Sequence, residues 1–298
     1  MFELPVASLA DVLRHEFMQR AFLAGLLVSV VAGIVGAYVV INRMVFISGA
    51  IAHVAFGGIG LAYYFGIPPM HGALGFSVAS AVGMGVVERL GRERADTLIG
   101  ALWAIGMAMG MLLIKATPGI RADPMTYLFG TITMIPEQRV TLMLGLALVV
   151  LLVFALLYKE WLAVSFDPTF ASVRNVPVFP LKLLQLALVA GAVVMLMEVV
   201  GLILVLALLT LPVATANLWL RDFRLVVLAA ILLAALSNTL GLWLAYHWNL
   251  MAGPTIVLLA AAIYLAAFFL HLLWRTLRPR RADRQSPPLS ESSSPASG

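Results

Sequence analysis

Residues 46–58 read FISGAIAHVAFGG, an apolar stretch in which His53 stands among small residues. The stretch lies inside a predicted membrane span, where an ionisable side chain is costly and usually serves a function. Gly49, His53 and Gly57 follow one another at four-residue spacing, which places them on one face of a helix. Small residues at this spacing let another helix come close. We therefore expect His53 to point toward a neighbouring helix rather than toward lipid.

Two interpretations of His53 follow from this position. Its ring is either hydrogen-bonded to a neighbouring backbone carbonyl, or it is a ligand or proton site on a transport path. Small residues at the same spacing predict further helix-packing faces at Gly25, Ser29 and Gly33 and at Gly106 and Gly110.

Composition determines the broad class, because 62% of the 298 residues are hydrophobic and only 11% are charged. That leaves too little polar surface for a soluble globule of this size, so we expect an all-α polytopic membrane protein. The absence of cysteine excludes disulfides, thiolate metal ligands and a thiol nucleophile. The net charge of +5 comes from arginines in short loops and at the C-terminus, so it indicates membrane topology rather than nucleic-acid binding.

Hydrocarbon about 30 Å thick needs about 20 apolar residues per helix, and this length predicts about nine spans. The boundary between two of these spans is uncertain from sequence, because residues 182–219 also fit a single long helix kinked at Pro212. That alternative would leave about eight spans. Only the divided version places every basic cluster on one side of the membrane. It puts the N-terminus outside and the C-terminus in the cytoplasm of a multi-pass protein of the cell (inner) membrane. The expected spans are 21–41, 46–65, 71–89, 97–115, 139–158, 182–198, 201–219, 225–247 and 254–274.

The same pattern divides the chain into three regions. Residues 1–20 are expected to form a short amphipathic segment on the outer surface, and residues 21–274 the transmembrane domain. Residues 275–298 begin with a basic run and continue into Ser/Pro-rich sequence. Such a composition cannot bury apolar area, so we expect a disordered cytoplasmic tail.

Motifs for enzymatic chemistry are absent from the sequence. It has no Gly-x-x-x-x-Gly-Lys loop to hold the phosphates of ATP and no His-Glu-x-x-His zinc protease motif. We therefore do not expect an enzyme, and any ATP must be bound by a partner.

Several segments occur in a specific order: NRMVFIS followed by GAIAH at 42–53, DTLIG at 96–100, YLFG at 127–130, FDP followed by Ala171 at 166–171, and VGLILV leading to ATA at 200–216. Together they resemble the membrane permeases of ABC importers for divalent metal ions, the zinc, manganese and iron uptake systems of bacteria and archaea. The resemblance covers the chain up to about residue 274 and implies the ABC importer permease fold.

The resemblance also implies partners and a substrate. A homodimer of such permeases works with two ATPase subunits and one extracytoplasmic metal-binding protein. The transported substrate would be a divalent metal ion, either zinc or manganese, with iron as a further candidate. No cofactor would be bound by this chain, since ATP would be bound by the partner subunits.

The loop at 159–181 contains a predicted short helix. Asp167 can cap a helix that begins at Pro168, and Pro177 stops it. In the family, the matching segment is the coupling helix that lodges in the ATPase, which implies that role for Asp167, Pro168, Phe170 and Ala171. A glycine is common in the family near the position of Asn175.

One departure from the family concerns the metal path. Many members carry Asp-Ala-(Leu or Ile)-Ser-His where this chain has Gly-Ala-Ile-Ala-His, so the acidic partner of His53 is missing at Gly49. Asp and His at i and i+4 would form a bidentate site suited to Mn or Zn. Three explanations stay open: an acid from another helix substitutes, the ion keeps more of its water, or the substrate is not a bare cation.

Glu198 is the candidate substitute, because it is the acidic residue within the apolar run 181–219. The expected metal-contacting residues are therefore His53 and Glu198, although Glu198 also fits a solvated position in an outer loop. The main alternative to an ABC importer is a secondary transporter, in which an ion gradient drives transport and His53 or Glu198 titrates. A membrane scaffold without transport activity is a second alternative.

Overall fold

The computed structural model describes residues 16–90, 95–118, 130 and 137–277, and these residues form helices and their connections without any strand. In this described part of the chain, eight helices are long and apolar enough to cross a membrane, and a ninth span results if α7 and α8, which meet at a bend of 69°, count as one. The expected all-α polytopic membrane bundle is confirmed. The helices are α2 (Glu16–Ile41), α3 (Val45–Phe65), α4 (Pro69–Leu90), α5 (Ala95–Ala116), α7 (Glu137–Leu156), α8 (Tyr158–Phe166), α9 (Pro168–Val173), α10 (Val178–Val200), α11 (Leu202–Trp219), α12 (Phe223–His247) and α13 (Ala252–Leu277).

The helices α10 and α11 are separated by Gly201. Its φ of 84° and ψ of 158° belong to a region that L side chains rarely adopt, so the helix stops at a residue suited to the break. A single long helix over residues 182–219 is therefore wrong, and Pro212 lies inside α11 instead of dividing it. Gly130 packs against this break, because a Cβ at that position would overlap the carbonyl group of Val200.

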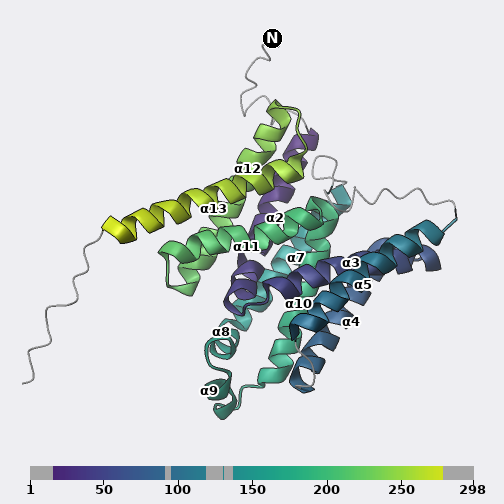
Figure 1. The fold of residues 1–298 in the computed structure, drawn as a ribbon, viewed down its shortest axis with the longest axis horizontal. Helices are drawn as coiled ribbons and strands as arrows, with labels where there is room; N and C mark the ends of the chain where they lie inside the picture. Colours follow the sequence, from purple (N-terminus) through teal and green to yellow (C-terminus); the bar gives the residue numbers. More distant parts are fainter. Residues whose placement is uncertain (1–15, 91–94, 119–129, 131–136, 278–298) are drawn as a thin grey trace, which may run out of the picture.

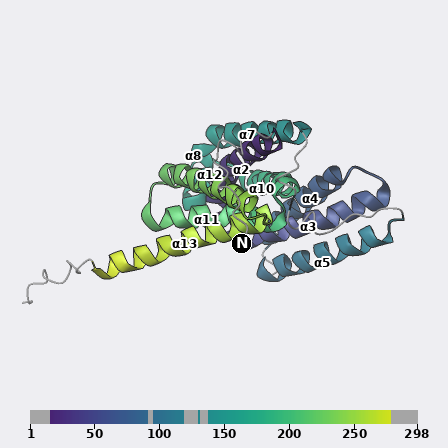
Figure 2. The ribbon, with the colours of Figure 1, turned by 90° about the horizontal axis from the view of Figure 1, so that it is seen from above.

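The helix α2 lies at the centre of the bundle and packs against α12, α11 and α7. A second group consists of α3, α4 and α5, and α10 joins it to the rest through contacts with α4, α3 and α2. Figures 1 and 2 show this second group on one side of the molecule and α11, α12 and α13 on the other. The helices differ in how much of their most apolar stretch is buried inside the bundle. This share is 72% for α2 and for α3, but only 22% for α5 and 11% for α13. The outer faces of α5 and α13 are therefore left for lipid or for another chain.

The first predicted packing face lies between α2 and α12. A Cβ on Gly33 would stand 2.8 Å from the backbone nitrogen of Ile231, so the two helices touch at backbone level. Nearby, the buried side-chain amide of Asn238 donates hydrogen bonds to Ser29 Oγ at 2.8 Å and to the carbonyl of Gly25 at 3.1 Å. Small residues and one polar group thus hold this pair together, as expected for helices in lipid.

The helix α8 was not expected, because the predicted cytoplasmic loop begins at Lys159. The chain instead bends after α7 and remains helical, which brings Trp161 into the core at 1% exposure. Its ring lies 4.4 Å from that of Phe154 and 5.7 Å from that of Tyr38, measured between centroids. Burial of this large aromatic side chain stabilises a helix that carries two charged residues, Lys159 and Glu160, in its first turn.

The ends of the chain lie mostly outside the described residues. Of the expected amphipathic segment 1–20, residues 16–20 belong to α2, and the rest is outside the described part. Of the expected tail 275–298, residues 275–277 complete α13, and residues 278–298 are again outside it.

Candidate metal-ion site

His53 lies in the middle of α3, half-buried, on the face that meets α5. Its ring nitrogen Nδ1 is 2.9 Å from the carbonyl oxygen of Gly49, one turn earlier in the same helix. A carbonyl can only accept, so Nδ1 donates this hydrogen bond, and in the neutral ring the lone pair is then on Nε2. Metal-binding histidines are typically fixed in this way, by donation from the other ring nitrogen to a backbone carbonyl. The expected hydrogen bond from His53 to a backbone carbonyl is therefore present. It is compatible with the other interpretation, in which His53 is a ligand on a transport path.

The indole of Trp103, on α5, covers His53 and Gly49 together. The centroids of the imidazole and the indole lie 4.4 Å apart with 35° between the ring planes. A Cβ on Gly49 would stand 2.9 Å from Cζ3 of Trp103 and 3.1 Å from Cη2. The indole therefore fills the space beside Gly49 in which the acidic residue expected from the resemblance would stand.

Backbone contact between α3 and α5 keeps this arrangement in place. A Cβ on Gly106 would be 2.7 Å from Cα of Val54 and 2.8 Å from the carbonyl oxygen of His53. One turn further along α5, a Cβ on Gly60 of α3 would be 2.8 Å from Cα of Gly110. The predicted packing face at Gly106 and Gly110 is confirmed, and it lies directly against the His53 segment.

Sequence reasoning missed Trp103. It precedes Gly106 by three residues and Gly110 by seven, so helical periodicity places all three on one face of α5. This spacing was the signal in the sequence that Trp103 faces α3. It does not indicate which residue of α3 the indole contacts.

The second expected metal contact, Glu198, lies in the last turn of α10. Its side chain is outside what the structure describes, so a contact between Glu198 and the ion path at His53 stays a prediction. Within the described ranges, no three His, Cys, Asp or Glu side chains form a group able to hold a metal ion. Among the residues that the structure describes, the candidate site therefore offers one imidazole, that of His53, beside the indole of Trp103.

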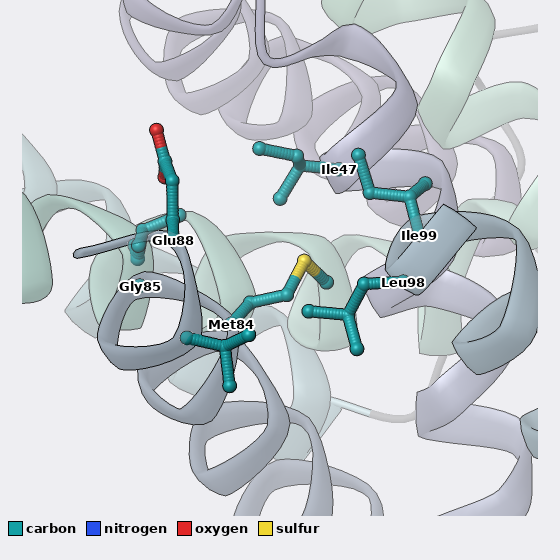
Figure 3. Close-up of a pocket in the computed structure, with 8 residues that line it drawn as sticks. Ile47, Met84, Gly85, Glu88, Leu98 and Ile99 are labelled. Carbon is teal, nitrogen blue, oxygen red and sulfur yellow. The ribbon is translucent and has the colours of Figure 1, made fainter. Parts of the chain in front are cut away.

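A small cavity lies between α3, α4, α5 and α10, toward the start of α3 (Figure 3). Its volume is about 20 Å³, room for about one water molecule. Its wall is apolar, as Ile47, Met84 and Ile99 illustrate, apart from Glu88 at its edge. The carboxylate of Glu88 pairs with Lys182 Nζ at 2.6 Å, so this cavity offers a divalent ion no unpaired carboxylate.

The predicted short helix after Asp167 is confirmed as α9. The carboxylate Oδ1 of Asp167 accepts a hydrogen bond from the backbone N–H of Phe170 at 2.9 Å, and Pro168 occupies the first turn. Ala171 is buried at 1% exposure, whereas Phe170 and Val173 are 53% and 78% exposed. The helix is thus anchored by one side and presents apolar side chains on the other.

Asn175 ends this segment with a φ of 59°. This left-handed conformation favours glycine, and asparagine is among the residues that tolerate it. Asparagine at this position is therefore compatible with the left-handed backbone that ends the segment.

Comparison with known proteins agrees with these observations. Residues 14–271 match the ABC 3 transport family. An uncharacterized membrane protein of Synechocystis is 48% identical over 87% of this chain and 92% of its own length. The manganese transport system membrane protein MntC of Listeria monocytogenes is 31% identical over 87% of this chain and 92% of its own.

A solved structure, PsaBC from Streptococcus pneumoniae in complex with Fab, has a chain that superposes with a TM-score of 0.79 at 29% identity, covering 87% of this chain and 94% of that chain. The fold, the sequence profile and the relatives agree, and this chain belongs to the ABC 3 transport family, the membrane permeases of metal-ion ABC importers.

Proposed function

We propose that this chain is the permease subunit of an ATP-driven importer of divalent metal ions and that the ion passes along His53. The observation that carries this proposal is the geometry of His53: an ionisable side chain at mid-span, fixed by Gly49 and directed at a helix contact, with Nε2 free to meet a cation. A site with few protein ligands suits permeation, because an ion must also leave it.

The proposed assembly comprises two copies of this chain, two ATPase subunits and an extracytoplasmic metal-binding protein. The exposed apolar residues of the α8–α9 segment support a contact with the ATPase, since an isolated chain gains nothing by exposing Phe166, Phe170 and Val173 together. In this proposal Asp167, Pro168, Phe170 and Ala171 form the coupling helix, and α9 transmits closure of the ATPases to α10, which it contacts.

The proposed orientation places the C-terminus in the cytoplasm and the N-terminus outside the cell (inner) membrane. It is supported by the basic residues that flank the α8–α9 segment and the end of α13, because such residues favour the cytoplasmic side. With this orientation Glu198 lies toward the outer end of α10. We propose it as the acidic residue that an incoming ion meets before His53.

The test is metal uptake into proteoliposomes that hold this chain with its ATPase, with Zn, Mn and Fe compared in the presence and absence of ATP and of the binding protein. We expect uptake that requires ATP, and we expect His53→Ala to abolish it while the ATPase still copurifies. His271→Ala, in α13, is the matched histidine control and should leave uptake unchanged. Uptake driven by a proton or sodium gradient without ATP would establish the secondary transporter instead.

A further inference from the structure

The space beside Gly49 is closed by apolar groups from two other helices. Trp103 of α5 lies against it, and Cδ2 of Leu206, on α11, would be 3.6 Å from a Cβ at this position. The face of α3 that carries His53 therefore has an imidazole, an indole and a leucine side chain around it. The three atoms nearest to a Cβ at position 49, two from Trp103 and one from Leu206, are all carbon atoms.

We propose that Trp103 is a specificity-determining residue of the His53 site, because it occupies the place of a carboxylate and leaves an imidazole nitrogen as the protein ligand. The consequence is a preference for Zn²⁺ over Mn²⁺ at this point of the path. This inference rests on the proposed function, since it presupposes that the ion passes His53.

The chemical argument concerns ligand type. Imidazole nitrogen binds first-row divalent ions in an order that places Zn²⁺ above Mn²⁺, whereas carboxylate and water oxygens are the ligands that suit Mn²⁺. An aromatic face attracts cations through its quadrupole, but this attraction does not depend on the identity of the metal. Replacing a carboxylate by an indole therefore removes the ligand that Mn²⁺ prefers and keeps the ligand that Zn²⁺ accepts.

The geometric argument is that Gly49 and Trp103 depend on each other. An aspartate at position 49 would bring its Cβ within 2.9 Å of the indole, so the ring would have to move. The same ring stacks on His53, but Nδ1 of His53 is held separately by the backbone carbonyl of residue 49. A smaller residue at position 103 therefore makes room for a carboxylate at position 49 and keeps the hydrogen bond that orients the imidazole.

The experiment measures the ratio of Mn to Zn uptake by the reconstituted permease, ATPase and binding protein, with the same binding protein throughout so that changes in the ratio come from the permease. We expect the double variant Gly49→Asp/Trp103→Ala to raise the Mn/Zn ratio about tenfold, the lower end of the range for changes around metal ligands. Trp103→Ala alone opens the space without adding a carboxylate, so it should raise the ratio by less than the double variant does. Gly49→Asp alone should reduce uptake of both ions.

Gly49→Asn/Trp103→Ala is the matched control, because it has the same shape without the charge, and it should leave the ratio unchanged. If the double variant does not assemble, Trp103→Glu supplies a carboxylate from α5 and should raise the ratio, whereas Trp103→Gln should not. An unchanged ratio in Gly49→Asp/Trp103→Ala, or the same rise in Gly49→Asp alone, would overturn the role of Trp103.

These outcomes are separate from failure of the proposed function. If uptake by the wild type does not need ATP, or if the His53→Ala variant still takes up metal, the proposed function fails. If uptake needs ATP and His53 but the ratio does not respond to the carboxylate variants, only the inference about Trp103 fails.

Discussion

The contact between α3 and α5 is held by backbone against backbone, whereas α9 is held by one capping carboxylate and one buried methyl group. At the first, hypothetical Cβ atoms on Gly57, Gly60 and Gly106 would all come within 2.9 Å of the opposite helix. At the second, Asp167 caps the helix and Ala171 is buried, while Phe170 is half-exposed.

This difference indicates two kinds of function. A contact without room for any side chain has one arrangement, so it fixes His53 and Trp103 relative to each other. A short amphipathic helix with exposed apolar residues is incomplete by itself and gains its stability from whatever covers it. The α3–α5 contact is thus complete within the chain, and the α8–α9 segment is not.

The largest expected effect comes from breaking the first contact with Gly106→Leu. The new side chain would have to displace the backbone of Val54, and overpacking of this kind costs about 1–3 kcal/mol or more. We expect a lower melting temperature of the purified chain in detergent and loss of monodisperse protein. Gly100→Leu, on the same helix with open space around it, is the control. Equal melting temperatures for the two variants would contradict the close contact.

In α9, Asp167→Arg is expected to have a large effect on coupling to the ATPase rather than on stability. Loss of the cap costs about 1 kcal/mol, and the reversed charge faces the proposed ATPase site. We expect ATPase binding to be lost, or ATP hydrolysis to continue without uptake, while the melting temperature of the isolated chain falls only slightly.

Asp222→Arg is the matched control for that variant, because Asp222 also caps a helix, through the backbone N–H of Arg224 at 2.8 Å. It should lower stability to a similar degree and preserve coupling. If both variants uncouple hydrolysis equally, capping in general and not the α9 segment is responsible.

A smaller effect is expected for Phe170→Ser, which removes an exposed ring from α9. Exposed substitutions usually change stability by less than about 0.5 kcal/mol, so the isolated chain should melt as the wild type does. Binding of the ATPase, measured by titration in detergent, should weaken. A drop in the stability of the isolated chain would show instead that Phe170 belongs to its core.

Much of this comparison was predictable from sequence, for identifiable reasons. Apolar run length located the spans, and the distribution of basic residues favoured the division that Gly201 makes between α10 and α11. Asp167 and Pro168 are local signals, so α9 was predicted with its correct start.

What could not be predicted depends on contacts between distant segments. The helix α8 exists because Trp161 packs on Phe154 and Tyr38, and nothing local to Lys159 indicates that packing. The relation of Trp103 to Gly49 is likewise tertiary, so the sequence showed that an acid was missing at Gly49 but not what had taken its place.

The smallest expected effect concerns the link between the two regions. Lys182 of α10, which follows the α8–α9 segment, pairs with Glu88 of α4, which belongs to the α3–α5 group. Both side chains are partly exposed, at 38% and 44%, so the pair contributes at most about 1 kcal/mol and is screened by salt. Lys182→Gln should therefore lower the melting temperature slightly at low ionic strength and not at high ionic strength, with Glu88→Gln/Lys182→Gln no worse than the single variant. If Lys182→Gln uncoupled hydrolysis from uptake, the ion pair would have a second role, that of transmitting motion from the α8–α9 segment to the His53 region.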